Sequence, residues 1–153
     1  MIQFRTAAKL AAIAGLWIGS GAAAPADLPQ SLAVDVVSLR SAKGALIVCL
    51  TRLPDHFPDC TGDPDRRHYT VSAAQARANG ITIADLPPGG YALALIHDEN
   101  GNRKLDTFAG IPREGVAFSR NPPIRFGAPS FRSARFVIAG APVEQDVTMK
   151  YFL

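Results

Sequence analysis

The sequence predicts an all-β domain, an antiparallel sandwich of about seven strands. Short runs rich in Val, Ile and aromatic residues alternate with turn residues along most of the chain. A helical period is almost absent. The length that remains after the N-terminal segment is also close to that of a common sandwich domain, about 100 residues or slightly more. A small closed barrel is the competing architecture, and the strand pattern does not separate the two.

Strands in the first half of the chain are expected between clear turn signals. Residues 32–39 are rich in valine and lead through "RSAKG" into the apolar run 45–50, so these two segments are expected to pair as an antiparallel hairpin. Two more candidates, 67–73 and 80–86, are separated by a polar, alanine-rich stretch with room for a single helical turn.

The second half places the remaining strands around one long irregular segment. The run 91–96 follows a Pro-Pro-Gly-Gly turn and is expected to be a buried strand. Residues 107–129 show no periodicity, and a segment of this length is either functional or disordered. Its phenylalanines argue against disorder. Strands at 133–140 and 144–153 close the chain, and the last is expected to place one face on Val147, Met149, Tyr151 and Leu153.

The N-terminal segment, residues 1–24, has the layout of a secretory signal peptide. Arg5 and Lys9 precede an apolar stretch, and small residues follow in "GSGAAAPAD". The apolar stretch is shorter than the roughly 20 residues that cross a bilayer, which argues against an uncleaved anchor. Cleavage is expected between residues 23 and 26, which leaves a single domain, 27–153, with no transmembrane span and a periplasmic or secreted location.

Cleavage of this leader changes the charge of the protein. The whole chain has 16 Lys and Arg against 13 Asp and Glu, and removal of Arg5 and Lys9 leaves 14 against 13. A nearly neutral domain has little electrostatic attraction for a phosphate backbone. The sequence therefore predicts no nucleic-acid partner.

Both cysteines, Cys49 and Cys60, lie in the exported part, where an oxidising compartment favours their pairing. The segment between them has two prolines and little regular pattern, so a covalent link would hold it in place. Two free buried thiols are the alternative. A metal pair is disfavoured, because His56 is the only nearby soft ligand. The sequence favours a disulfide.

The segment "HDENGNRKLD", residues 97–106, carries oxygen-bearing side chains at alternate positions. Its spacing matches the first part of a D-x-[DN]-x-[DN] calcium loop. Alternate side chains of a tightly curled backbone point to a common centre, where several oxygens can meet one ion. The predicted calcium ligands are Asp98, Asn100, Asn102 and Asp106, with Glu114 of "IPREG" as a fifth candidate.

Two other interpretations of this segment remain open. Arg103 stands where a helical calcium loop has glycine, and a positive φ there would cost on the order of 1 kcal/mol. A plain hairpin turn at Asn100-Gly101 is therefore an alternative to the metal loop. Catalysis is disfavoured: His97 is expected to be a hydrogen-bonded structural side chain, and the sequence has no G-x-S-x-G motif and no zinc-spaced histidine pair.

The segment 107–132 mixes phenylalanine, arginine and proline, a composition suited to a ligand or partner surface. The candidate residues for that surface are Phe118, Arg125, Phe126 and Phe131. The alternative, which we favour, is that the phenylalanines fix the segment over an open edge or face of the sandwich.

The chain resembles the exported bacterial family called domain of unknown function 2141. The family core reads approximately "LPPGxYAxxxxHDENGNxKLDTxxxGIPxEGxxFS", followed by a proline- and phenylalanine-containing segment and a final strand. The matching parts of this sequence are 86–92, 97–106, 110–115, 118–119 and 126–131. The cysteine arrangement also resembles one branch of the family. Together these parts span nearly all of the mature domain.

The resemblance has two departures and several implications. Arg103 stands where the family often has glycine, and Val116-Ala117 where an aromatic residue and glycine are common. The resemblance implies a prealbumin-like or Ig-like β-sandwich, and it brings no established activity. The D-x-N-x-N-x-x-x-D element is similar to calcium loops of surface-protein β-sandwich repeats, which strengthens the calcium prediction.

The sequence thus predicts an exported, non-enzymatic β-sandwich with calcium bound at the loop after its central strand. The second hypothesis is an envelope binding module that recognises a carbohydrate, lipid or protein component of the cell envelope through residues 107–132. A hydrolase ranks third, because no nucleophile or metal-bound water can be assigned.

Overall fold

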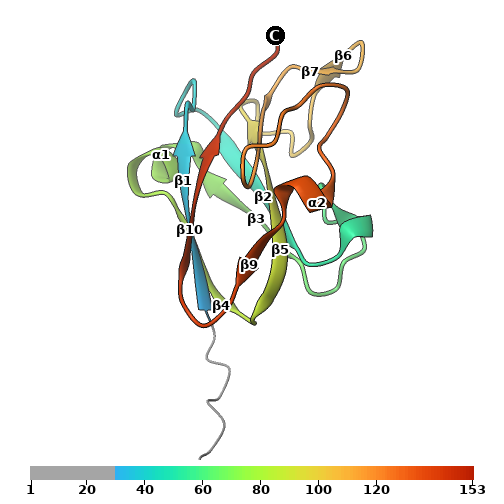
Figure 1. The fold of residues 1–153 in the computed structure, drawn as a ribbon. Coiled ribbons are helices and arrows are strands. Elements are labelled where there is room, and N and C mark those ends of the chain that lie inside the picture. The colour runs from blue at the N-terminus through green and yellow to red at the C-terminus, as the bar shows by residue number, and fades with distance from the viewer. Residues whose placement is uncertain (1–29) are drawn as a thin grey trace, which may run out of the picture.

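The structure, a computed structural model, describes residues 30–153, whose strands form two main sheets (Figure 1). The smaller sheet has the strand order β10-β1-β4, with bounds Val143–Thr148, Gln30–Val37 and Ile81–Leu86. The larger sheet has the order β3-β2-β5-β8, with bounds Arg67–Ser72, Ala45–Thr51, Gly89–Asp98 and Gly115–Phe118. A further strand, β9 (Phe136–Ile138), pairs with the start of β5.

Short elements complete the described part of the chain. They are a 3-10 helix at Pro54–His56, helix α1 at Ala73–Asn79, helix α2 at Phe131–Ala134, and a small hairpin of β6 (Thr107–Phe108) and β7 (Ile111–Pro112). None of the helices within 30–153 is long and apolar enough to cross a membrane. The expected signal peptide and its cleavage site lie outside the described residues.

The mostly β architecture predicted from the sequence is confirmed. The barrel alternative is wrong, because neither sheet closes on itself: β10 and β4 form the two edges of the smaller sheet, and β3 is an edge of the larger one. The molecule is therefore built from two open sheets.

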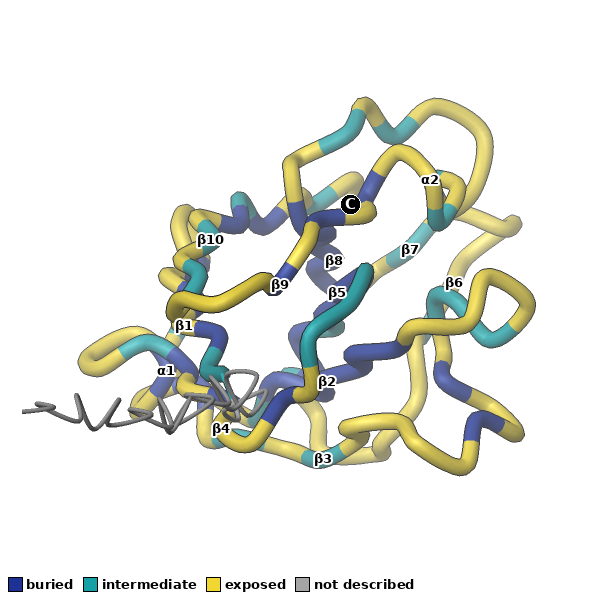
Figure 2. Tube along the Cα trace, turned by 60° about the horizontal axis from the view of Figure 1, so that its bottom comes forward, coloured by how far each residue is buried: buried dark blue, intermediate teal, exposed yellow. Residues whose placement is uncertain are grey.

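The main hydrophobic core lies between these two sheets. In β1, Leu32, Val34 and Val36 are buried while the residues between them are exposed, as expected for a strand with one face in the core. Side chains of the larger sheet belong to the same cluster, among them Leu46, Val48, Leu93 and Leu95. Figure 2 shows buried segments along β2, β5 and β8 and exposed loops around them.

The larger sheet is buried on its outer face as well. β8 is buried at every position, and β2 and β5 at nearly every position. Their outward side chains, including Cys49, Ala94, Val116 and Phe118, form a second apolar cluster. It is covered by residues from the surrounding loops and α2, namely Phe57, Cys60, Ile124, Phe131 and Ala134. This outer face positions the candidate site.

The predicted hairpin of residues 32–39 and 45–50 is wrong. Both strands exist, but β1 lies in the smaller sheet between β10 and β4, whereas β2 lies in the larger sheet between β3 and β5. Turn residues show that the chain reverses direction, and they do not show which sheet receives the next strand. The burial of the two strands does differ, since β1 has one buried face and β2 has two.

The sheets are not entirely antiparallel. β1 and β10 run parallel, with Leu32 opposite Val143 and Val37 opposite Thr148. The chain reaches β10 from β9, which lies beside β5 in the larger sheet. Between β9 and β10 the chain therefore crosses to the smaller sheet, where β10 runs beside β1 and in the same direction as β1. A crossing of this kind has no local turn signature in the sequence.

The segment expected to be irregular, 107–129, contains the hairpin β6-β7 and the strand β8. β8 escaped detection because it is buried on both faces and has no alternating pattern. The expected strand 133–140 is confirmed only over β9, since its first residues belong to α2. Helix α1 is seven residues long and exceeds the expected single turn.

The last strand, expected over 144–153, ends at Thr148. Val147 and Met149 are buried in the core, and Tyr151 packs against it, so these three share the predicted face. Leu153 is exposed and does not continue it. The chain leaves the sheet after β10 and runs toward β6 and β7 (Figure 1).

Cys49 and Cys60 form the predicted disulfide, with a sequence separation of 11. Replacing both cysteines with alanine is expected to lower the free energy of unfolding by about 2 to 3 kcal/mol, because the open chain regains the entropy that the closed ring removes. Urea unfolding of the double variant, compared with the native protein before and after reduction, measures the loss. Identical midpoints for all three samples would contradict this expectation.

Candidate metal loop and apolar cavity

Asp98, the last residue of β5, organises the polar loop from its buried end. The residue is 1% exposed. Oδ1 accepts hydrogen bonds from the backbone N–H groups of Gly101 at 2.7 Å and Asn102 at 3.2 Å, and Oδ2 accepts one from Arg103 at 2.7 Å. Such bonds to a charged acceptor are stronger than neutral ones. Asp98 therefore holds the turn in shape.

The Asp106 carboxylate, at the other end of the loop, accepts hydrogen bonds from the two asparagines predicted as ligands. The Asn100 side-chain amide donates to Asp106 Oδ2 at 2.6 Å, and that of Asn102 donates to both carboxylate oxygens at 2.9 Å. The amide oxygens accept instead from backbone N–H groups, that of Asn100 from Asn102 and that of Asn102 from Lys104. Four of the predicted ligands thus belong to one loop network.

Glu114, the fifth predicted ligand, joins this network from the segment after β7. Its Oε2 accepts a hydrogen bond from the Asp106 backbone N–H at 3.0 Å. Its side chain is buried, and within residues 30–153 Oε1 has no hydrogen-bond partner. Burial raises the pKa of Glu114. The carboxylates of Asp106 and Asp98 add to this rise, and the backbone N–H groups of Asp106 and Glu99 oppose it without cancelling it. The structure therefore brings the predicted ligands together.

The acidic residues of this cluster make no ion pair in the described part of the chain. Within residues 30–153 the ion pair found is Arg40–Glu99, and it involves none of Asp98, Asp106 and Glu114. The same residues contain no group of three or more His, Cys, Asp or Glu side chains arranged to hold a metal ion. An ion at this loop would therefore depend on asparagine oxygens, backbone carbonyls or water in addition to carboxylates.

Arg103 adopts the left-handed backbone conformation that its position requires, with φ at +61°. This conformation lets its N–H group donate to Asp98 Oδ2. Arginine at this position costs on the order of 1 kcal/mol relative to glycine. The loop therefore keeps its tight turn despite the departure from the family pattern, at some cost in stability.

His97, which precedes the loop, is a structural side chain, as expected. It is fully buried, with Nε2 2.9 Å from the backbone carbonyl of Lys43 and Nδ1 2.8 Å from the hydroxyl of Tyr151. Because a carbonyl can only accept, Nε2 carries the proton and Nδ1 accepts from the tyrosine. Both ring nitrogens are engaged. Tyr151 was not identified from the sequence as the partner.

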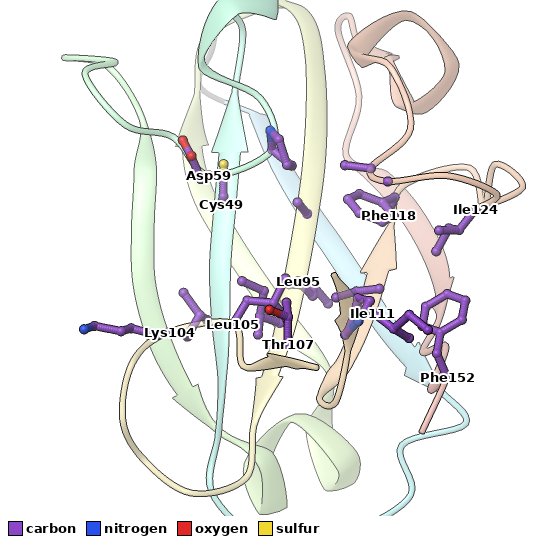
Figure 3. A pocket seen from close by; sticks show the side chains of 18 of the residues that line it. Cys49, Asp59, Leu95, Lys104, Leu105, Thr107, Ile111, Phe118, Ile124 and Phe152 are labelled. Atoms are coloured by element: carbon purple, nitrogen blue, oxygen red, sulfur yellow. The ribbon is translucent and has the colours of Figure 1, made fainter. Parts of the chain in front are cut away.

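An apolar cavity of about 930 Å³ lies on the outer face of the larger sheet. Its floor consists of outward side chains of β2, β5 and β8, among them Ile47, Cys49, Ala94, Ile96, Val116 and Phe118. Its walls come from the loop after β5, the β6-β7 hairpin and residues 124–128. Figure 3 shows Leu105, Thr107 and Ile111 in front of the strands and Phe152 beside Ile111.

Exposed apolar side chains gather around the opening of this cavity. Leu105, Ile111, Phe126 and Phe152 all line it and are all exposed, and Phe126 is exposed completely. Exposed large apolar side chains that lie together are a usual mark of a binding surface. The cavity therefore combines a buried apolar floor with an exposed apolar rim.

Of the residues predicted as a ligand surface, Phe118, Arg125 and Phe126 line the cavity. Phe131 does not: its ring packs edge-on against Phe57, with centroids 6.0 Å apart, and Phe118 packs on the same ring at 5.8 Å. Two phenylalanines thus anchor the segment on the sheet, while Phe126 faces solvent. Sequence reasoning missed lining residues from other segments, including Ile96, Leu105, Ile111 and Phe152.

Fold and site together define a mostly β, disulfide-linked domain with a polar loop and an apolar cavity on one sheet face. The family model described as "Uncharacterized protein conserved in bacteria (DUF2141)" matches residues 34–146, and the chain belongs to this family. The resemblance noted in the sequence is thereby confirmed. The matched range includes all five predicted metal ligands. Comparison with curated proteins and with solved structures finds no match.

Proposed function

We propose that this protein is an exported, non-enzymatic domain in which calcium stabilises the loop formed by residues 98–114. The observation that carries the proposal is Glu114 Oε1, a buried carboxylate oxygen beside the acidic loop that has no hydrogen-bond partner among the described residues. Buried polar atoms are almost always partnered, and an unpartnered one calls for an explanation. A cation would supply the missing partner and balance the acidic side chains.

The donor set favours calcium among common metal ions. Carboxylates of Asp98, Asp106 and Glu114 and amide oxygens of Asn100 and Asn102 are hard oxygen ligands, which calcium accepts in varied number and geometry. The two asparagines now donate N–H groups to Asp106. Calcium would replace those groups as the partner of Asp106, and the amides would turn their oxygens toward the ion.

Calorimetric titration of the chelator-treated protein with calcium tests the proposal. We expect saturable binding and a melting temperature that rises with calcium concentration, since an ion that binds only the folded state stabilises it by mass action. Magnesium, which demands a stricter geometry, should have a smaller effect. Absence of heat and of any thermal shift at millimolar calcium would eliminate the metal loop.

Glu114→Gln is expected to have opposite effects without and with calcium. In chelator it should raise stability by on the order of 1 kcal/mol, because it removes a buried charge whose oxygens accept a hydrogen bond from only one backbone N–H group, that of Asp106, among the described residues. In calcium it should abolish most of the stabilisation by the ion. Thermal unfolding in both buffers measures the two effects.

Glu144→Gln is the matched control for this substitution, since Glu144 is an exposed carboxylate of β10. It should change neither the stability in chelator nor the response to calcium. If Glu114→Gln lowers stability in chelator and leaves the response to calcium unchanged, Glu114 is not a calcium ligand.

The proposed location is periplasmic or secreted, which the disulfide supports because such bonds persist in oxidising compartments. We further propose that the two sheets form a sandwich of the prealbumin-like or Ig-like type. The shared core between the sheets supports this assignment.

A second candidate function is a binding module of the cell envelope. The apolar cavity favours it, since its volume of about 930 Å³ lies within the range of small-molecule sites. Residues 107–132, for which a ligand surface is the less favoured of the two interpretations from the sequence, supply one side of this cavity.

A further inference from the structure

We infer that the cavity on the outer sheet face binds a single-chain anionic amphiphile, with its acyl chain on the apolar floor and its head group at a cationic rim. This inference rests on the binding-module proposal and names its ligand class. It is independent of calcium.

The floor is suited to an acyl chain because its side chains are apolar and lie on adjacent strands. Ile47, Ala94 and Val116 come from β2, β5 and β8, and all are buried. The backbone polar groups of these strands are paired within the sheet, so the floor offers little to a ligand that must form many hydrogen bonds. A saturated chain loses no hydrogen bonds when it leaves water for such a surface.

The rim carries unpaired positive charge. Arg103, Lys104 and Arg125 line the cavity, and within residues 30–153 their side chains make no ion pair and no hydrogen bond. The carboxylate at the cavity, Asp59, accepts a hydrogen bond from the Thr61 backbone N–H at 2.8 Å, and that bond lowers the pKa of Asp59. The positive charges are thus in excess, which complements an anionic head group.

The shape of the site favours a free amphiphile over a membrane surface. Phe126 and Leu105 could touch a bilayer, but the floor is recessed behind the β6-β7 hairpin and the loop after β5 (Figure 3). A planar surface would leave this recess empty. A single chain can enter it and bury apolar area on the floor and on the exposed rim together.

The test is calorimetric titration of the mature protein in calcium-free buffer with decanoate, decanol and decyltrimethylammonium, each below its micelle concentration. These probes share one chain and differ in head-group charge. We expect decanoate to bind most tightly and the cation most weakly. Across octanoate, decanoate and dodecanoate the dissociation constant should fall by about fourfold per methylene, the equivalent of about 0.8 kcal/mol per buried CH₂.

Two kinds of variant locate the ligand. Lys104→Glu combined with Arg125→Glu should weaken decanoate binding by about tenfold and leave decanol binding unchanged. Arg132→Glu is the matched control, because Arg132 is exposed on α2 and does not line the cavity. Ile96→Trp should weaken all chains by filling the floor, and circular dichroism and the melting temperature verify that each variant folds.

Several results would overturn the inference. If decanol binds as tightly as decanoate and ignores the charge reversal, the cavity is a binding site but not one for anions. If no probe binds, the amphiphile inference fails, and the binding-module proposal is left with a carbohydrate or a protein as its ligand. If vesicles of anionic phospholipid capture the protein while monomeric decanoate does not, this face docks on a membrane instead.

Discussion

Gly44→Ala is expected to lower the free energy of unfolding by about 3 to 4 kcal/mol. Gly44 has a φ of +68°, and a Cβ atom there would lie 2.0 Å from the carbonyl oxygen of Asp98 and 2.8 Å from Cα of Glu99. The backbone conformation costs alanine about 1 kcal/mol. The clash is with main-chain atoms, so no side-chain rotation relieves it, and the forced shift adds up to about 3 kcal/mol.

Gly140→Ala is the control, because Gly140 has a similar φ of +76° but no atom of the described residues lies within 4 Å of its ideal Cβ. It should cost only about 1 kcal/mol. Urea unfolding of both variants separates the free-energy cost of the positive φ from the cost of the clash with the main chain. Equal losses of unfolding free energy in the two variants would mean that the segment before β2 does not pack against the start of the polar loop.

Much of the fold was accessible from sequence because its strands follow local patterns. β1 alternates buried and exposed residues, and the apolar run of β2 is bounded by turn residues, so both were predicted nearly at their observed bounds. Their placement in different sheets was not accessible, since it depends on which faces pack together. β8 was missed for a related reason: it is buried on both faces, and its four residues show no period.

The candidate site also has a part that local sequence patterns predicted and a part that they did not. The polar loop was found because the predicted ligands lie close together in the sequence, and the structure does bring Asp98, Asp106 and Glu114 close to one another. The cavity was found only through the residues of one segment, such as Phe126. Its floor belongs to three strands and its rim includes Phe152, residues that no local motif connects. Only the paired strands and the loops packed on them bring these side chains to one face.

Asp98→Ala is expected to cost about 3 to 4 kcal/mol of stability even in chelator, before any metal is considered. Its buried carboxylate accepts from three backbone N–H groups, and two of these, on Gly101 and Arg103, have no other acceptor among residues 30–153. Hydrogen bonds to a charged group contribute about 1.5 to 3 kcal/mol each. Water replaces part of this loss, because these loop residues are exposed.

Asp106→Ala is the informative comparison, because among the described residues the Asp106 carboxylate accepts only from the exposed side-chain amides of Asn100 and Asn102. In chelator it should cost less than about 1 kcal/mol. In calcium, however, both aspartate variants should lose the stabilisation by the ion. Chemical unfolding of the two variants in both buffers therefore separates the turn from the metal site. If the two variants lose different amounts of stability in chelator but both keep the full calcium response, Asp98 stabilises a hairpin turn. Calcium would then bind at another place.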